Sequence, residues 1–357
     1  MNKIRKKYRP GRKSRWFVLM LFSLFIYLGY YQLWHHSKRV NSNIYTLNKV
    51  LSSHLSDIWS VKFSPDGDWL SSGSVDSTIK IWNKKSGKVA LNIRQPDGII
   101  SIDFSPDGNY LASSSYDAKV RLWKLPQGVL VKEFSGHTGT VWSVNFSPDG
   151  KTIASCGEEA TIKLWNVESG HIVRNFRGHT RNVWDVKFSP DGNYLASGSF
   201  DKTARIWNLK DGGLLHVLTN HTEAVVALAF SPDGKKLVTT SDDKTIKLWN
   251  TNNWSLMYSL EVPEHNQATD FNPDNKLLIT GGRDKTALGE FLQNFFGDSE
   301  YNKGISMRLW DAQTGQLLQT FSNHSNDVND VTFSPDGKWI ASSSSDRTIG
   351  LWLLSRQ

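Results

Sequence analysis

One feature limits the folds open to this chain more than any other, a unit of about 41 residues that occurs seven times. A tryptophan completes each unit, and these residues are Trp82, Trp123, Trp165, Trp207, Trp249, Trp310 and Trp352. Consecutive tryptophans lie 41 or 42 residues apart, except for Trp249 and Trp310, which are 61 residues apart. A unit of this size is too small to bury its own apolar faces. The repetition therefore implies a fold in which neighbouring units pack together.

Each unit contains three short segments with the composition of β-strands. In residues 178–208 the segments are NVWDVKF, NYLASGS and TARIWN, and a Ser-Pro-Asp-Gly turn joins the first two. In this turn Pro190 fixes φ, Asp191 accepts a local backbone hydrogen bond and Gly192 accepts a positive φ. Valine, tryptophan and phenylalanine favour strands on either side of it. The phenylalanine that opens the turn recurs at Phe63, Phe104, Phe146, Phe188, Phe230 and Phe333, and Phe271 opens the looser FNPDN.

Residues 44–357 resemble the WD-repeat family of β-propellers, whose repeats of about 40 residues carry Gly-His and Trp-Asp signals. The Trp-Asp pair itself remains only at Trp310-Asp311, whereas four repeats have Trp-Asn. The resemblance implies an all-β domain, a seven-bladed β-propeller of four-stranded antiparallel blades. The uniform Ser-Pro-Asp-Gly repeats resemble those of bacterial, especially cyanobacterial, WD proteins.

The chain ends with the third strand of its last unit, TIGLWLLSRQ, so one outer strand is missing there. Residues 44–51 lie where other repeats carry an outer strand. We expect them to complete the last blade after a polar linker over residues 35–43. A ring closed in this way has no unpaired edge between its first and last blades.

The resemblance also implies a hydrogen-bonded tetrad in four units, in which Asp orients His and His bonds through Ser or Thr to the Trp ring nitrogen. The members are His54, Ser72, Asp76 and Trp82; His179, Ser197, Asp201 and Trp207; His221, Thr239, Asp243 and Trp249; and His324, Ser342, Asp346 and Trp352. A Ser-His-Asp catalytic triad is the alternative interpretation. An enzyme needs one catalytic triad, whereas the buried polar groups of every blade need hydrogen-bond partners. The repetition therefore favours a structural, hydrogen-bonding role for the tetrad.

Three units depart from the tetrad. Gln95 stands in the His position of the second unit, Glu159 stands in the Asp position of the third, and His265 comes three residues late in the sixth. We expect these blades to use substitute hydrogen bonds or to be locally less stable.

The amino terminus predicts a membrane anchor. Residues 1–15 are a basic tail, and residues 16–34 contain no charge and would span about 28 Å as a helix. Tryptophan and tyrosine lie at both ends of this segment, and no small-residue cleavage site follows it, so we predict an uncleaved transmembrane signal-anchor helix rather than a signal peptide. Eight basic residues precede the segment, which predicts a single-pass protein with a cytoplasmic N-terminus. The propeller would then lie on the far side, in the periplasm or a lumen.

The net charge of +8 comes from this tail and carries no argument for a nucleic-acid partner. Residues 1–39 contain ten Lys or Arg and no acid, which leaves 32 basic and 34 acidic residues in the remainder. No phosphate-binding loop and no Cys/His cluster with metal-ligand spacing occurs, and Cys156 is the only cysteine. We therefore expect no cofactor, no metal and no small-molecule substrate.

Variation between the units points to a partner-binding face. By the resemblance, the residue four before each turn phenylalanine lines the upper mouth of the central channel, and the residue before each corner acid lies nearby. These positions place an aromatic arc in the first four units, made of Trp59, Tyr116, Trp142, Trp184 and Phe200. Such rings suit a binding hot spot and can stack on a cationic or proline-rich segment. Alternatively, the tryptophans plug the channel.

The long interval in the sixth unit contains an insertion at residues 287–306. Phe291 and Phe295 belong to an apolar stripe with helical spacing, and Arg283 is the corner residue that precedes the insertion. The stripe would either pack on the sixth blade and cover the channel, or face a partner or the membrane.

These observations favour a membrane-tethered, non-enzymatic scaffold that binds protein or peptide partners through the upper face of the propeller. The first alternative is a hydrolase-like propeller enzyme with a site at the channel mouth, built from Glu158, Asp242 and Arg283. The second is an assembly factor for a membrane complex, which would share the scaffold's chemistry and differ in its partner.

Overall fold

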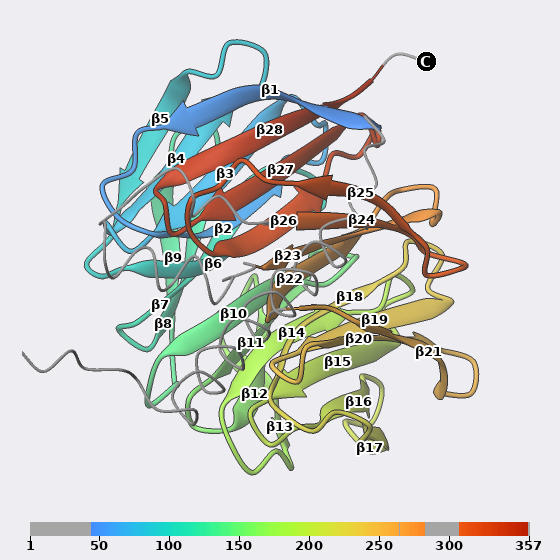
Figure 1. Ribbon diagram of the computed structural model, residues 1–357. Helices are drawn as coiled ribbons and strands as arrows, with labels where there is room; N and C mark the ends of the chain where they lie inside the picture. The colour runs from blue at the N-terminus through green and yellow to red at the C-terminus, as the bar shows by residue number, and fades with distance from the viewer. Residues whose placement is uncertain (1–43, 264, 283–306, 356–357) are drawn as a thin grey trace, which may run out of the picture. The chain divides into compact units, whose positions relative to one another are not determined.

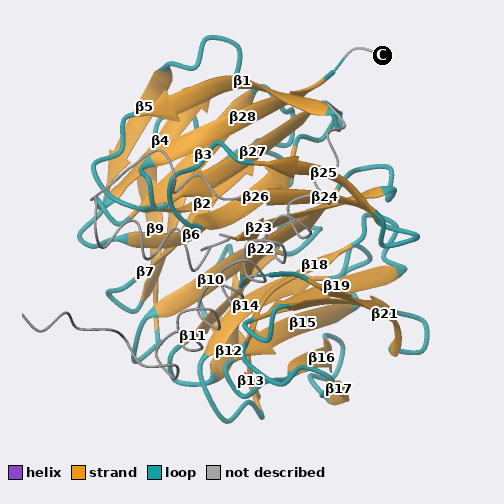
Figure 2. Ribbon diagram, in the orientation of Figure 1, coloured by secondary structure: helices purple, strands orange, loops and turns teal. Residues whose placement is uncertain are grey.

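The computed structural model describes residues 44–263, 265–282 and 307–355, and all regular elements in these ranges are β-strands (Figures 1 and 2). They form seven four-stranded antiparallel sheets, which confirms the prediction of an all-β, seven-bladed propeller. The predicted anchor at residues 16–34 lies outside the described residues. Within them, no helix has the length and apolar character that crossing a membrane requires.

Each blade uses four strands that are consecutive in the sequence, except the seventh. Blade one consists of β2 (Ile58–Phe63), β3 (Trp69–Ser74), β4 (Thr78–Asn83) and β5 (Val89–Arg94). Blade two consists of β6 (Ile99–Phe104), β7 (Tyr110–Ser115), β8 (Lys119–Lys124) and β9 (Val129–Ser135). Blade three consists of β10 (Val141–Phe146), β11 (Thr152–Gly157), β12 (Thr161–Asn166) and β13 (Ile172–Arg177). Blade four consists of β14 (Val183–Phe188), β15 (Tyr194–Ser199), β16 (Ala204–Asn208) and β17 (Leu214–Leu218).

Blade five consists of β18 (Val225–Phe230), β19 (Lys236–Ser241), β20 (Thr245–Asn250) and β21 (Ser255–Glu261). Blade six consists of β22 (Asn266–Phe271), β23 (Leu277–Gly282), β24 (Met307–Asp311) and β25 (Leu317–Phe321). Blade seven consists of β26 (Val328–Phe333), β27 (Trp339–Ser344), β28 (Thr348–Leu354) and β1 (Tyr45–Ser52). The first strands of consecutive blades contact one another, and β2 contacts β26, so the seven sheets form a closed ring.

Strand β1 closes the ring from the amino-terminal side of the domain. It pairs antiparallel with β28, from Tyr45 opposite Leu354 to Ser52 opposite Thr348, and Figure 1 shows the blue and red strands side by side. The buried Tyr45 also joins this blade to blade six, because its N–H donates to Gln319 Oε1 at 2.9 Å and its carbonyl accepts from Gln319 Nε2 at 2.6 Å. The last blade is therefore built from both ends of the domain.

The hydrophobic core is divided among the interfaces between neighbouring blades. Trp207 of blade four packs with Ile162, Leu164 and Phe176 of blade three, and the other blades repeat this arrangement. In all seven blades the tryptophan ring N–H donates to a buried Ser or Thr of the second strand, at 2.7 to 3.3 Å. Each tryptophan therefore joins two sheets by packing and fixes its own sheet by a hydrogen bond.

The four complete tetrads have closely similar geometry. In each, a histidine Nδ1 lies 2.8 to 2.9 Å from the aspartate and Nε2 lies 2.7 to 2.8 Å from the Ser or Thr hydroxyl. The aspartate also accepts the backbone N–H of the residue after the histidine. The hydroxyls are completely buried, so a substrate cannot reach them, which argues against a catalytic triad at these positions.

The three irregular blades differ in how far they replace the tetrad. In blade two Gln95 Oε1 accepts from Ser113 Oγ at 3.0 Å, and in blade three His137 Nδ1 lies 2.5 Å from Glu159. Among the described residues of blade six, the bond from Trp310 to Thr280 is present, and His265 lies 3.3 Å from Asp242 of blade five. Substitute bonds thus occur in blades two and three.

The tetrads predict a loss of stability in acid. Burial alone would raise the pKa of Asp243, but hydrogen bonds from Thr245, Thr222 N and His221 lower it to about 2. The stabilisation is present above the ordinary aspartate pKa and is lost as the pH falls toward 2, because the unfolded chain binds the proton first. Burial also lowers the pKa of His221, so the loss begins as the pH falls below the ordinary histidine value.

We expect Asp243→Asn to lower the free energy of unfolding at pH 7 by about 1–2 kcal/mol and to flatten its dependence on pH in acid. Denaturant titrations of the full-length chain at several pH values measure both effects. Asp68→Asn removes an exposed carboxylate from a turn and is the matched control. An unchanged pH slope in Asp243→Asn would contradict the assignment.

Candidate functional site

A β-bulge in the first strand of every blade forms the mouth of the central channel. The register between first and second strands shifts at one residue in each blade, and these residues are Trp59, Ile100, Trp142, Trp184, Val226, Gln267 and Asn329. A bulge leaves its extra residue out of the ladder and redirects its side chain. All seven line one cavity of about 80 Å³ that is partly open to solvent. They are the seven positions that the resemblance implied for the channel mouth.

The structure brings the five residues of the predicted aromatic arc into one connected cluster. Trp142 and Trp184 stack with ring centroids 4.3 Å apart and planes 18° apart. Tyr116 lies edge-on to Trp142 at 6.3 Å, and Phe200 lies edge-on to Trp184 at 5.2 Å. Trp59 reaches Trp184 from blade one, with centroids 6.3 Å apart. We call these five side chains the aromatic cluster.

The aromatic cluster has features of both a channel plug and a binding surface. Its rings pack on one another, as a plug would, yet all five side chains are only half-buried. The buried Nε1 of Trp142 has no hydrogen-bond partner within the described residues. The remaining predicted residues Arg283, Phe291 and Phe295 lie outside the described residues.

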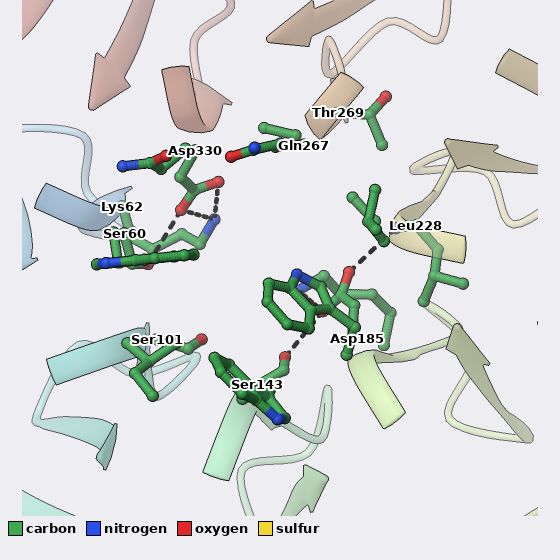
Figure 3. Close-up of a pocket in the computed structure, with 18 residues that line it drawn as sticks. Ser60, Lys62, Ser101, Ser143, Asp185, Leu228, Gln267, Thr269 and Asp330 are labelled. Carbon is green, nitrogen blue, oxygen red and sulfur yellow. Dashed lines mark hydrogen bonds and ion pairs between the residues drawn. The ribbon is translucent and has the colours of Figure 1, made fainter. Parts of the chain in front are cut away.

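Below the aromatic cluster the channel contains paired charges (Figure 3). Lys62 Nζ donates to Asp330 Oδ2 at 2.8 Å, and Lys187 Nζ lies 3.0 Å from Asp185 Oδ1. Asp330 also accepts from Ser60 Oγ and from Val61 N, each at 3.0 Å. Burial alone would lower the pKa of Lys187, but the carboxylates of Asp185, Asp330 and Asp103 together outweigh it and raise the pKa. Lys187 is therefore charged at neutral pH.

Two further carboxylates lie at this depth, in blades two and six. Asp103 accepts from Phe146 N and Asn145 Nδ2, both at 2.8 Å, and Asp270 accepts from Phe333 N at 2.8 Å. Burial raises the pKa of both groups, that of Asp270 to about 6. At this depth the described residues thus include four aspartates and two lysines.

Most of these side chains connect one blade to the next. A side-chain oxygen of one first strand accepts a backbone N–H of the following first strand at six of the seven interfaces among the described residues. The pairs are Ser60 with Ile102, Ser101 with Val144, Asp103 with Phe146, Asn145 with Phe188, Asp185 with Leu228, Asp270 with Phe333, and Asp330 with Val61. Blade five has Ala227 and Ala229 at the corresponding positions, and Thr240 Oγ1 there donates to Asn266 O at 3.0 Å.

Sequence reasoning missed this layer of charged and polar acceptors. The available signal was a charged residue inside an otherwise apolar first strand, as in DVKF and SIDF, one residue before the turn phenylalanine. Charged side chains are unfavourable in a strand that is buried on both faces, unless backbone N–H groups at an uncovered strand edge need hydrogen-bond acceptors.

Of the residues considered for an enzyme site, Glu158 and Asp242 lie within the described part of the chain and Arg283 does not. Glu158 accepts a hydrogen bond from Thr140 N at 3.2 Å. Asp242 lies beside the exposed His265, and burial raises the pKa of Asp242. No group of three or more His, Cys, Asp or Glu side chains in the described residues is arranged to hold a metal ion. Cys156 is completely buried, and burial raises the pKa of its thiol well above the ordinary value, so it is unreactive.

Comparison with known proteins identifies the repeats. Residues 45–83, 88–124, 128–166, 170–208, 212–250, 258–288 and 315–352 match the family model of the WD domain, G-beta repeat (WD40). The match covers more than half of the chain and includes all seven blades. The bacterial character expected from the repeats stays a prediction.

Individual relatives match only pieces of the chain. Seventy residues are 34% identical to human WD repeat-containing protein 36, and this match covers 20% of this chain and 7% of that protein. One hundred residues are 33% identical to WD repeat and SOCS box-containing protein 1 of Xenopus tropicalis, 28% of this chain and 21% of that protein. Fifty residues are 44% identical to nuclear distribution protein PAC1 of Arthroderma benhamiae, and this match covers 14% of this chain and 11% of that protein. The matches thus cover about a fifth or less of each relative.

The pairing of Asp330 predicts a weak point at the interface of blades seven and one. Asp330→Ala would leave Lys62 Nζ and Val61 N without their acceptor, and we expect the free energy of unfolding to fall by about 2–4 kcal/mol. Asp330→Asn keeps an oxygen for Val61 N and should cost less. Denaturant unfolding of the full-length chain measures both. A change below about 0.5 kcal/mol in the alanine variant, as at an exposed site, would overturn the prediction.

Proposed function

The chain belongs to the WD40 family of G-beta repeat proteins, and we propose that it is a membrane-tethered, non-enzymatic scaffold that binds a protein or peptide segment at the channel mouth. The family and the relatives support a role in protein interaction. The aromatic cluster is the observation that carries the choice of surface. Five rings from blades one to four remain half-exposed at one end of the ring of sheets.

Strand direction defines the end at which a partner would bind. Ile58 at the start of β2 lies opposite Ser74 at the end of β3, so the corner after each second strand lies beside the start of the first strand. The mouth residue Trp59 and corner residues such as Tyr116 and Phe200 therefore share one face, which we call the mouth face. The Ser-Pro-Asp-Gly turns lie at the opposite ends of the strands.

Large, half-exposed aromatic side chains suit a binding hot spot. They bury much apolar area on association, and their rings lose little conformational entropy because neighbouring rings already hold them. The edge-on and stacked contacts of the aromatic cluster provide this preorganisation. An assembly factor for a membrane complex would use the same surface and would differ only in its partner.

We expect the double variant Trp142→Ala plus Trp184→Ala to lose most of the chain's binding to its partners while remaining folded. Partners crosslinked and copurified with the full-length chain from membranes provide the measurement, by quantitative mass spectrometry. The matched control is Trp254→Ala plus Trp339→Ala, which removes two half-buried tryptophans from the opposite strand ends. Equal recovery of partners by both folded variants would reject the mouth face as the binding surface.

The membrane tether is a separate part of the proposal and rests on residues 1–34 of the sequence. An uncharged segment of nineteen residues preceded by eight basic residues supports an anchor with a cytoplasmic N-terminus. The propeller would then lie across the membrane, in the periplasm or a lumen.

Reporter fusions to the C-terminus test this topology. We expect a reporter that is active only outside the cytoplasm to be active on the full-length chain and inactive when residues 1–34 are deleted. A cytoplasm-specific reporter at the same position should show the reverse. Activity of the cytoplasmic reporter on the membrane-bound full-length chain would reject the proposed placement.

A further inference from the structure

Carboxylates border the aromatic cluster on the mouth face. Asp57 and Asp97 lie in the connections that lead into β2 and β6. The N–H of Val75 donates to Asp57 O at 3.0 Å and that of Tyr116 to Gly98 O at 3.4 Å, so these connections contact the corners of their own blades. A Cβ added to Gly98 would lie 3.0 Å from the ring of Tyr116, which shows how closely that ring covers the chain beside Asp97.

The carboxylates are close enough to affect the tyrosine. Burial raises the pKa of Tyr116, and the negative charges of Asp57 and Asp97 raise it further. Two acids and one aromatic ring thus share a small area at the edge of the aromatic cluster, where a positive charge would be stabilised.

Charge pairing differs among the carboxylates of the mouth face. Glu223 pairs with Lys202 at 3.2 Å, and Asp242 lies 3.3 Å from His265. The corner acids Asp117 and Glu159 pair with Arg121 and Lys163. Within the described residues, no ion pair with Lys or Arg forms at Asp57, Asp97, Glu158 or Asp327. Arg347 follows the corner acid of blade seven, whereas uncharged residues follow it in blades one to three, so the carboxylates without a basic neighbour lie on the blades that carry Trp59, Tyr116 and Trp142.

We propose that the segment bound at the mouth face is cationic, with a Lys or Arg side chain that lies against the rings of Tyr116 and Trp142 and between Asp57 and Asp97. The inference rests on the proposed function, because it specifies the partner of the same surface. Aromatic faces attract a cation electrostatically, and neighbouring carboxylates add a Coulomb attraction that a neutral segment does not receive. A proline-rich segment would use the rings alone and would not need the unpaired acids.

Three short fluorescent peptides of equal length test the charge requirement on the full-length chain. One alternates lysine with serine, the second is its Nε-acetylated form, and the third alternates proline with serine. We expect the lysine peptide to bind most tightly by fluorescence anisotropy, with an affinity that falls as salt rises. Equal or tighter binding of the acetylated or proline peptide would overturn the proposal.

Charge-removing variants locate the site. Asp57→Asn plus Asp97→Asn should raise the Kd of the lysine peptide at least about fivefold, because two favourable charges are lost. The matched control, Asp68→Asn plus Glu168→Gln, removes two exposed carboxylates from turns at the opposite strand ends and should leave the Kd unchanged. An equal effect of both pairs would show attraction to net charge alone and would overturn the proposal.

The mouth face as the binding surface and the cationic nature of its partner can be rejected separately. If Trp142→Ala plus Trp184→Ala abolishes partner recovery while the aspartate variants bind the lysine peptide normally, the mouth face is the binding surface but its partner is not cationic. If the aromatic substitutions have no effect on partners or peptides, both the surface and the cationic partner are rejected.

Discussion

The first strand of each blade has one hydrogen-bonding edge that no other strand covers, and the rest of the ring depends on how this edge is satisfied. Side-chain oxygens of the preceding blade accept its N–H groups, as Asp185 accepts from Leu228 and Asp330 from Val61. An unpaired backbone group in a channel costs about as much as a lost hydrogen bond, so these contacts fix the position of each blade relative to the next. They also explain why charged residues lie inside otherwise apolar strands.

The same strands divide their residues between structure and recognition. The first strands of all blades except the fifth alternate core residues with acceptors, and in every blade the bulge releases one further side chain, such as Trp59 or Trp184, from the ladder into the mouth. That side chain contributes little to its own sheet and is free to vary. In the four complete tetrads the Ser or Thr and the Trp are buried in the second and third strands, so the tetrads stabilise their blades without restricting what the mouth can bind.

The aromatic cluster lies over a layer of paired charges. Lys62 and Lys187 of the channel are paired with carboxylates, and rings from four blades cover them. The WD40 repeats account for the blades, whereas the mouth residues are positions at which the seven repeats of this chain differ from one another. Under the proposed function, these few positions select the partner.

The sequence alone determined the blades, because period, turn motif and tryptophan spacing are local patterns that each unit repeats. It also located the mouth positions, from Trp59 to Asn329, since a repeat aligns equivalent residues. Only the tertiary structure decided which of them touch. Trp59 of blade one and Trp184 of blade four are in contact because the ring closes. For the same reason Lys62 pairs with Asp330, which is 268 residues away in the sequence. Contacts between distant blades depend on ring curvature and bulge geometry, which no single unit encodes.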